Sequence, residues 1–298
     1  MNKTKKILLN ILLGFVGFVL LVGILFFAVD PGIPVTRLND EGVATRCLSL
    51  PNGYYIGESE LGFLNGEGTF KFDTGETYIG SWDNHEMNGK GELTSSLGVY
   101  IGDFVNSKKS GNGVFTWNDG TEYDGAWLED KMNGEGKVTT ASGVVYEGSF
   151  VNNMFSTGSI IVNDENGEYK FKVSEGHLVG SLSAKFNSGV TYEGEFSGTQ
   201  ITGTGTMTFP KVGEYVGDFI EGKRDGTGTF TWYDGTVYDG SWENDLIDGY
   251  GTYTFSSGSS LKGFFDKGTL DGTYTYSHSG NLFKTTWESG KCISVKEN

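Results

Sequence analysis

The stretch Thr236–Gly258, TVYDGSWENDLIDGYGTYTFSSG, is one copy of a unit that recurs along most of the 298-residue chain. The unit opens with Tyr238, and a glycine and a tryptophan follow at intervals of two residues. A polar turn, a Gly-x-Gly and two further aromatic residues complete it. A period held over this length indicates a repeat architecture. The leading position recurs every 22 or 23 residues, at Tyr55, Tyr78, Tyr100, Tyr123, Tyr146, Tyr169, Tyr192, Tyr215, Tyr238, Leu261 and Phe283.

Each unit is predicted to be a β-hairpin, because its apolar residues alternate with a period of two. In the quoted copy, Tyr238 and Trp242 share one face of the first strand, Tyr253 and Phe255 share one face of the second, and 243–245 is the turn. Glycines on the aromatic face leave notches where a ring can lie against bare backbone. A lone hairpin is only marginally stable, so copies must stack. We therefore expect an all-β, elongated solenoid of antiparallel hairpins.

The pattern Tyr-x-Gly-x-[Phe/Trp], followed by Gly-x-Gly and a closing Asp-Gly or Ser-Gly, resembles the MORN repeat. The best copies are Tyr78–Gly91, Tyr123–Gly136, Tyr215–Gly228 and Tyr238–Gly251, and the resemblance covers about residues 53–290. It implies a scaffold or attachment module, although a fold does not by itself define a function. It also implies structural roles for the repeat glycines, which are Gly80, Gly89, Gly91, Gly125, Gly134, Gly136, Gly217, Gly226, Gly228, Gly240, Gly249 and Gly251.

The periodic aromatic residues have two interpretations. They can form the core between stacked hairpins, or one side of the stripe can stay exposed and bind a partner segment or sugar rings. An exposed aromatic face of more than a few hundred Å² would be a binding surface. The candidate interaction residues are Tyr78, Trp82, Tyr123, Trp127, Tyr215, Phe219, Tyr238 and Trp242, and the core interpretation is the stronger one for them.

The N-terminal region predicts a membrane anchor. Residues 1–6 are a basic tail, and residues 7–29 are an apolar run interrupted only by Asn10. A run of this length can cross a bilayer as a helix, whereas the apolar core of a cleaved signal peptide is shorter. Lysines before the run place the N-terminus in the cytoplasm and the repeats on the outer side of the cytoplasmic membrane. Cleavage of the segment remains the alternative.

The remaining segment boundaries are predicted from how closely each stretch of sequence follows the repeat pattern. Residues 30–52 lack periodicity and are predicted to be a linker and an N-terminal cap. About ten units fill residues 53–290, and those at about 144–189 are degenerate, through simple decay or because they form a bend or partner site. Residues 291–298 are expected to be a tail.

The charge of the chain limits its partners. The formal net charge is −16, and phosphate neutralisation requires basic patches, so nucleic acid is not an expected ligand. Adhesion of the repeats to anionic lipid is disfavoured for the same reason. The two cysteines, Cys47 and Cys292, lie before the first unit and after the last, so they are expected to be unpaired or to form an intermolecular bridge.

The sequence offers no recognisable catalytic set. The three histidines lie in different units without a metal-ligand partner, and no GxSxG, P-loop or HExxH motif is present. We expect no cofactor and no enzyme activity. An envelope hydrolase, the least favoured hypothesis, would require carboxylates converging in a cleft.

These observations favour a non-enzymatic, membrane-anchored scaffold that binds protein partners or assembles with itself. A cell-wall or glycan-binding module that uses the periodic Trp and Tyr side chains is the alternative. A continuous apolar strip or an exposed edge strand would favour a protein partner, whereas an open cleft of stacked rings would favour a glycan.

Overall fold

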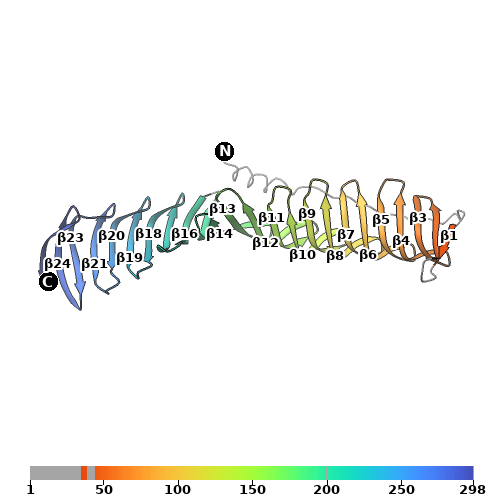
Figure 1. Ribbon diagram of the computed structural model, residues 1–298. Helices are drawn as coiled ribbons and strands as arrows, with labels where there is room; N and C mark the ends of the chain where they lie inside the picture. Colours follow the sequence, from red (N-terminus) through yellow and green to blue (C-terminus); the bar gives the residue numbers. More distant parts are fainter. Residues whose placement is uncertain (1–34, 39–43, 199, 298) are drawn as a thin grey trace. The chain divides into compact units, whose positions relative to one another are not determined.

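The computed structural model describes residues 35–38, 44–198 and 200–297, and all of its regular elements are β-strands (Figure 1). The predicted all-β class is therefore confirmed for these residues. The basic tail at residues 1–6 and the predicted transmembrane segment at residues 7–29 lie outside the described part of the chain.

The chain divides into two compact blocks. In the described part, the N-terminal block comprises residues up to Ile161 together with Val173–His177, and the C-terminal block comprises Val162–Lys172 and the chain from Leu178 onward. The strands up to the division are β1 Val35–Leu38, β2 Ala44–Leu50, β3 Gly53–Glu60, β4 Phe63–Phe72, β5 Thr77–Asp83, β6 Glu86–Ser95, β7 Gly98–Val105, β8 Lys108–Trp117, β9 Glu122–Leu128, β10 Lys131–Thr139, β11 Val145–Val151 and β12 Met154–Asn163. The later strands are β13 Gly167–Ser174, β14 His177–Phe186, β15 Thr191–Ser197, β16 Gln200–Phe209, β17 Gly213–Ile220, β18 Lys223–Trp232, β19 Val237–Glu243, β20 Leu246–Thr254, β21 Ser260–Asp266, β22 Thr269–Leu270, β23 Gly272–His278, β24 Asn281–Glu288 and β25 Lys291–Glu297.

Within each block the strands pair antiparallel with their chain neighbours, as the colour sequence in Figure 1 shows, except that β21 pairs with both β22 and β23. The sheet is open, because β25 pairs with β24 and does not return to an earlier strand of the described chain. Residues 291–297, expected as a tail, are thus a strand, and the predicted cap contributes β2, which pairs with β3.

The quoted unit forms the hairpin β19–β20. Its turn is Asn244–Asp245, and both residues have positive φ, at 48° and 71°. This is the type I′ geometry that suits two-residue hairpins. The pairing shifts between Gly240 and Trp242, where β20 carries a bulge. Gly249 lies in that bulge with a φ of 105°, so its position requires the conformational freedom of glycine.

The leading tyrosine is buried by its own hairpin. Gly240 pairs with Gly251, and the ring of Tyr238 covers both, so that an added Cβ at Gly251 would lie 2.4 Å from the tyrosine oxygen. The hydroxyl of Tyr238 donates to the carbonyl of Ser241 at 3.1 Å. The same hydrogen bond to the residue three positions on is made by Tyr55, Tyr78, Tyr100, Tyr123, Tyr192, Tyr215 and Tyr238.

Successive units are joined through rings that meet edge to face. Tyr78 contacts Trp82 of its own unit at 5.1 Å and Phe104 of the next unit at 5.0 Å, with interplanar angles of 89° and 84°. In the C-terminal block Tyr238 contacts Trp242 and Phe265 in the same way. Such pairs contribute about 0.5–1.5 kcal/mol each beyond the area they bury. The stability of a unit therefore depends on its neighbours.

The unit that begins at Tyr146 departs from this pattern. In this unit Gly148 pairs with Gly158. In a regular unit, such as the one with Gly240 and Gly251, the partner glycine lies one residue further along the second strand. The difference arises because the bulge on β12 contains one residue fewer than the bulge of a regular unit. This shortening accounts for the single clear glycine in the sequence of its second strand.

The unit that begins at Leu261 inverts the pattern. Its leading residue is not aromatic, and Tyr274 on the opposing region of β23 places its ring over Gly263. The Tyr274 hydroxyl donates to the carbonyl of Phe264. The notch over glycine is therefore filled from the other strand.

Candidate interaction surfaces

The eight aromatic residues proposed as candidate interaction residues lie in the core. Their exposed fractions run from 0 to 5 %. Tyr215 and Tyr238 are fully buried, and the indole N–H groups of Trp127 and Trp242 donate to backbone carbonyls at 2.9 and 3.0 Å. Packing between hairpins accounts for these rings, which form no open groove. The residues are Tyr78, Trp82, Tyr123, Trp127, Tyr215, Phe219, Tyr238 and Trp242.

Burial also changes the acidity of the tyrosines. Desolvation raises the pKa of Tyr123 and of Tyr238 to about 12, because a buried phenolate loses its hydration. Nearby carboxylates, such as Asp124 and Asp239, make a smaller contribution to the same shift. Such shifts here reflect core packing, since each hydroxyl already donates to a backbone carbonyl.

Two cations occupy equivalent positions in the two blocks. Lys109 on β8 and Arg224 on β18 stand nine residues after a leading tyrosine, where most units carry a Leu, Met or Ile. Lys109 Nζ lies 4.9 Å from the ring centroid of Trp127, and the Arg224 guanidinium carbon lies 4.4 Å from that of Trp242. Each cation also lies over a phenylalanine, at 5.2 and 5.6 Å. Cation–π attraction thus stabilises both charges at the edge of the core.

These two clusters were missed in the sequence, although a signal for them exists. Lys109 and Arg224 are 115 positions apart, which is five repeats of 23 residues. Residues 98–140 and 213–255 share this spacing throughout, including Trp at two positions of each segment. Alignment of the chain with itself at this larger period would have paired the two cations.

An exposed apolar row crosses the N-terminal block on the face opposite the buried tyrosines. Ile56, Ile79 and Ile101 are 46, 51 and 57 % exposed, and each immediately follows a leading tyrosine. Strand pairing places them in one line with Thr69 and Glu92 between them. We call Ile56, Ile79 and Ile101 the isoleucine row. In the C-terminal block the same register holds Glu193, Val216, Asp239 and Lys262.

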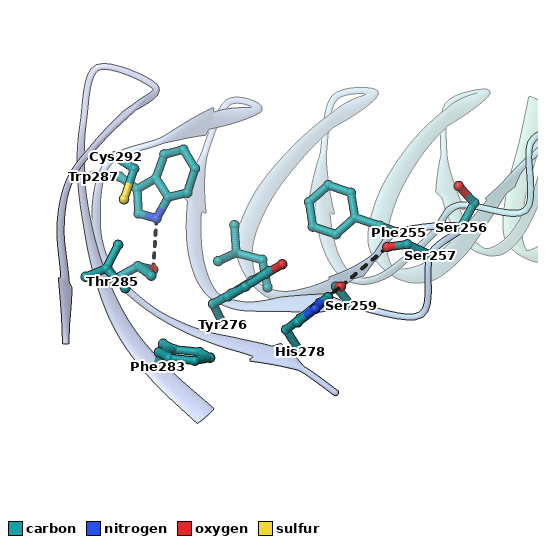
Figure 2. Close-up of a pocket in the computed structure, with 12 residues that line it drawn as sticks. Phe255, Ser256, Ser257, Ser259, Tyr276, His278, Phe283, Thr285, Trp287 and Cys292 are labelled. Carbon is teal, nitrogen blue, oxygen red and sulfur yellow. Dashed lines mark hydrogen bonds between the residues drawn. The ribbon is translucent and has the colours of Figure 1, made fainter. Parts of the chain in front are cut away.

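A second feature is a hollow of about 730 Å³ near the C-terminus, lined by the loop that follows β20 and by strands β21, β23, β24 and β25 (Figure 2). It lies where the repeat pattern ends. Thr285 stands at a position that is glycine in the regular units, and its hydroxyl donates to the carbonyl of Tyr274 at 3.3 Å. The leading residue Phe283 cannot lie over it as a tyrosine does over glycine. Figure 2 shows the lining residues Phe255, Tyr276, His278, Phe283, Thr285, Trp287 and Cys292.

The polar groups of the hollow bond mainly to one another. Ser259 Oγ lies 2.7 Å from His278 Nδ1, and the indole N–H of Trp287 donates to Thr285 Oγ1 at 2.9 Å. The walls that remain are Phe255, Tyr276 and other apolar side chains. The hollow is therefore a mostly apolar surface whose hydroxyl groups at Ser259 and Thr285 are buried and hydrogen-bonded.

The sequence profile of the MORN repeat matches this chain seven times. The matched segments are 55–77, 78–96, 100–122, 123–145, 192–211, 215–237 and 238–260, together more than half of the chain. The chain belongs to the MORN-repeat family. Each matched segment of this MORN-repeat protein begins with a tyrosine that makes the hydrogen bond described above. No match lies in residues 146–191, which contain the shortened bulge of β12. No curated protein matches the sequence.

The described residues contain no group of three His, Cys, Asp or Glu side chains that could hold a metal ion. The same part of the chain has no helix with the length and apolar character to span a membrane. Cys47 and Cys292 are both exposed free thiols.

Proposed function

We propose that this MORN-repeat protein is a non-enzymatic, membrane-anchored scaffold whose repeat array binds protein partners. The observation that carries the proposal is the isoleucine row, because three large apolar side chains about half exposed stand in strand register. Neighbouring strands lie about 4.8 Å apart, so side chains on alternate strands repeat at about 10 Å. A regular apolar strip of this kind fits a partner surface of matching spacing, and singly scattered apolar residues would not.

The membrane part of the proposal rests on the sequence. Residues 7–29 are apolar, and the lysines Lys3, Lys5 and Lys6 precede them. With the N-terminus in the cytoplasm, the repeats stand on the outer side of the membrane. Protease added to intact cells should digest the repeats of the native chain, and protection until the cells are lysed would contradict this orientation.

The test of the scaffold function compares the isoleucine row with an exposed apolar residue at the equivalent position in the other block. The full chain is captured from detergent-solubilised membranes after cross-linking, as wild type and as the triple variant Ile56→Lys, Ile79→Lys, Ile101→Lys. A partner protein should be recovered in proportion to wild-type bait and should be reduced at least tenfold with the triple variant. Val216→Lys, at a 50 % exposed site of the other block, is the control and should retain the partner. Equal recovery with the triple variant would exclude the isoleucine row as the binding site.

The glycan alternative is favoured by one observation, the aromatic walls of the hollow. Tyr276 and Trp287 are the rings on which a sugar could stack there. Retention of the full chain on purified cell wall, lost on addition of free sugar and in Tyr276→Ala, would support the glycan function. Absence of retention would leave the protein-binding scaffold.

A further inference from the structure

Neighbouring units are joined at their turns by a pair of hydrogen bonds. The backbone N–H of His85, in the turn between β5 and β6, donates to the carbonyl of Leu64 at 3.1 Å. The N–H of Leu64 donates back to Nδ1 of the His85 ring at 3.4 Å. We call such a pair of bonds a turn contact. We propose that protonation of His85 breaks the side-chain half of its turn contact, so that mild acid loosens the junction between the units that begin at Tyr55 and Tyr78.

The turn contact recurs with other acceptors. In four further units the second residue of the turn donates its N–H to a carbonyl of the preceding unit, and its side chain accepts the N–H of that same residue. Histidine is the one side chain in the set whose ordinary pKa brings its charge change between pH 5 and 8. The other pairs are Ser107 with Met87, Asp130 with Lys109, Asn153 with Met132 and Asp245 with Arg224.

Units with glycine at this position keep only the backbone half of the turn contact. Gly176, Gly222 and Gly268 donate to a carbonyl of the preceding unit and have no side chain that could accept in return. Protonation of His85 does more than remove the acceptor. Both ring nitrogens of an imidazolium are donors, so Nδ1–H would point at the N–H of Leu64. The charged ring must therefore turn away from Leu64, which is a fully buried core residue.

The surroundings of the His85 ring favour its neutral form. The ring is half-buried and lies against Phe63 of β4, with the ring centroids 4.9 Å apart. Desolvation by burial lowers the pKa of His85 below its ordinary value of 6.5. Within the described chain no charged side chain lies within ion-pair distance of the ring. The charged residues on the adjoining segments are Glu60 on β3, Asp83 and Glu86 on either side of the turn, and Lys108 beside the next turn.

The lowered pKa determines the direction of the pH dependence. The unfolded histidine binds a proton more readily than the folded one, so folding favours the neutral ring. The contribution of His85 to stability is therefore complete above about pH 6.5 and is lost as the pH falls toward the folded-state pKa. The amide of Asn153 at the equivalent position does not titrate, so its turn contact should be independent of pH.

The His85 turn contact joins the hairpins that carry Ile56 and Ile79. Loosening this junction disturbs the spacing of these two side chains, so capture of a partner by the isoleucine row should weaken in acid. Only this consequence rests on the proposed function. The pH response of the turn contact itself is measured without a partner, so failure of one proposal is distinguishable from failure of the other.

The experiment compares wild type with His85→Asn in the full chain in detergent. Asn153 has the same φ of 71° as His85, so asparagine suits the turn and supplies an acceptor that does not titrate. Amide hydrogen exchange is followed by mass spectrometry at about pH 8 and about pH 5. The ratio of rates in the two proteins cancels the intrinsic pH dependence of exchange. In peptides that cover residues 61–70 this ratio should be about one at the higher pH. At the lower pH wild type should exchange about three- to tenfold faster, as expected for one hydrogen bond. A ratio that does not rise in acid would overturn the proposal.

A second variant transfers the response to another turn. Asn153→His places an imidazole beside Met132, whose N–H now donates to the asparagine side chain at 2.8 Å. Acid should then speed exchange in peptides that cover residues 129–138, relative to wild type at the same pH. Peptides that cover residues 61–70 should respond equally in both proteins. If residues 129–138 of the variant show no response to acid, an imidazole at this turn position does not make the contact sensitive to pH, and the mechanism is wrong.

Discussion

Lys109 and Arg224 occupy the same position in two segments five repeats apart, yet their surroundings differ in one respect. Arg224 forms an ion pair with Asp245 at 3.1 Å and also donates to the backbone carbonyl of that residue at 2.8 Å. The equivalent Asp130 accepts from the Lys109 backbone N–H, just as Asp245 accepts from that of Arg224. The Lys109 ammonium, however, has no carboxylate within ion-pair distance in the described chain. The lysine charge therefore faces the rings directly and Asp130 only beyond ion-pair distance.

The difference reflects the shape of the two cations. The planar guanidinium of Arg224 lies over Trp242. It still reaches Asp245, because its Nε contacts the carboxylate and its Nη2 donates to the backbone carbonyl. The ammonium of Lys109 is a compact, strongly hydrated charge that cannot do both. Desolvation by burial accordingly lowers the pKa of Lys109, although Asp130 acts in the opposite direction. Both cations lie over aromatic rings, but only Arg224 also has a carboxylate that compensates for its lost hydration.

The largest expected loss of stability comes from a glycine-to-alanine substitution at an equivalent position in both segments. Gly113→Ala and Gly228→Ala would each place a Cβ 2.3 Å from the oxygen of a leading tyrosine, Tyr100 and Tyr215 respectively. The ring cannot move, because it is packed between two units, so we expect a loss of about 3 kcal/mol in the stability of the affected block. Hydrogen exchange followed by mass spectrometry should locate the loss in the block that carries the change. Gly180→Ala is the control, because φ is not positive there and the nearest atom to the added Cβ is the carbonyl oxygen of Phe196 at 3.9 Å.

The next prediction is that removing the two cations changes the stability of their blocks in opposite directions. Arg224→Met removes an ion pair and a stacked contact and should destabilise the C-terminal block by about 1–2 kcal/mol. Lys109→Met removes a half-buried charge that lacks an ion pair and should stabilise the N-terminal block by no more than about 1 kcal/mol, since the rings offset only part of the lost hydration. Methionine already fills the same position at Met87 and Met132, which are 1 and 6 % exposed. Urea unfolding with local hydrogen exchange measures both changes. Destabilisation by Lys109→Met would show that the rings outweigh the loss of hydration.

The pH dependence sharpens the same comparison. The folded-state pKa of Tyr123 and of Tyr238 is about 12, above the ordinary value of 10, so the stability they contribute is complete below pH 10 and is lost as the pH rises toward 12. Lys109 acts with the opposite sign, because its folded-state pKa is lowered and its deprotonation on a rising pH relieves an unfavourable charge. Melting temperatures should fall above pH 10 in both proteins, whereas below about pH 10.5 the wild type should gain stability relative to Lys109→Met as the pH rises. Identical slopes would contradict a buried lysine charge.

The sequence predicted the elements that repeat. Tyr238, its two paired glycines and the turn at 243–245 recur with fixed spacing, so alternation and turn composition were enough to predict a stacked hairpin and to interpret Trp242 as core. The strand pairs of the structure confirm the all-β, hairpin-based class. The bulge at Gly249 was not predicted, because a Gly-x-Gly in a strand does not show which glycine carries positive φ.

What the sequence could not predict lies where the pattern changes. Tyr274 takes the place of the missing leading tyrosine from the opposite strand, and Thr285 stands at a glycine position. Both outcomes depend on which side chain of the neighbouring strands fills the space over the backbone. The isoleucine row was also missed, since its residues alternate with the core and single exposed apolar residues are common on protein surfaces. Only the strand register shows that they form a line.

The smallest expected change in stability tests that line directly. Ile101→Thr and Val216→Thr alter equivalent positions that are 57 and 50 % exposed, and threonine is a good strand residue, so each should change stability by no more than about 0.5 kcal/mol. The two variants should differ in partner capture alone. Ile101 continues a row of isoleucines, and Val216 stands between threonines at Thr206 and Thr229. Recovery of the partner should therefore fall with Ile101→Thr and stay unchanged with Val216→Thr. If both variants capture equally, the apolar row contributes no binding, and the surface that holds the partner must lie elsewhere on the repeats.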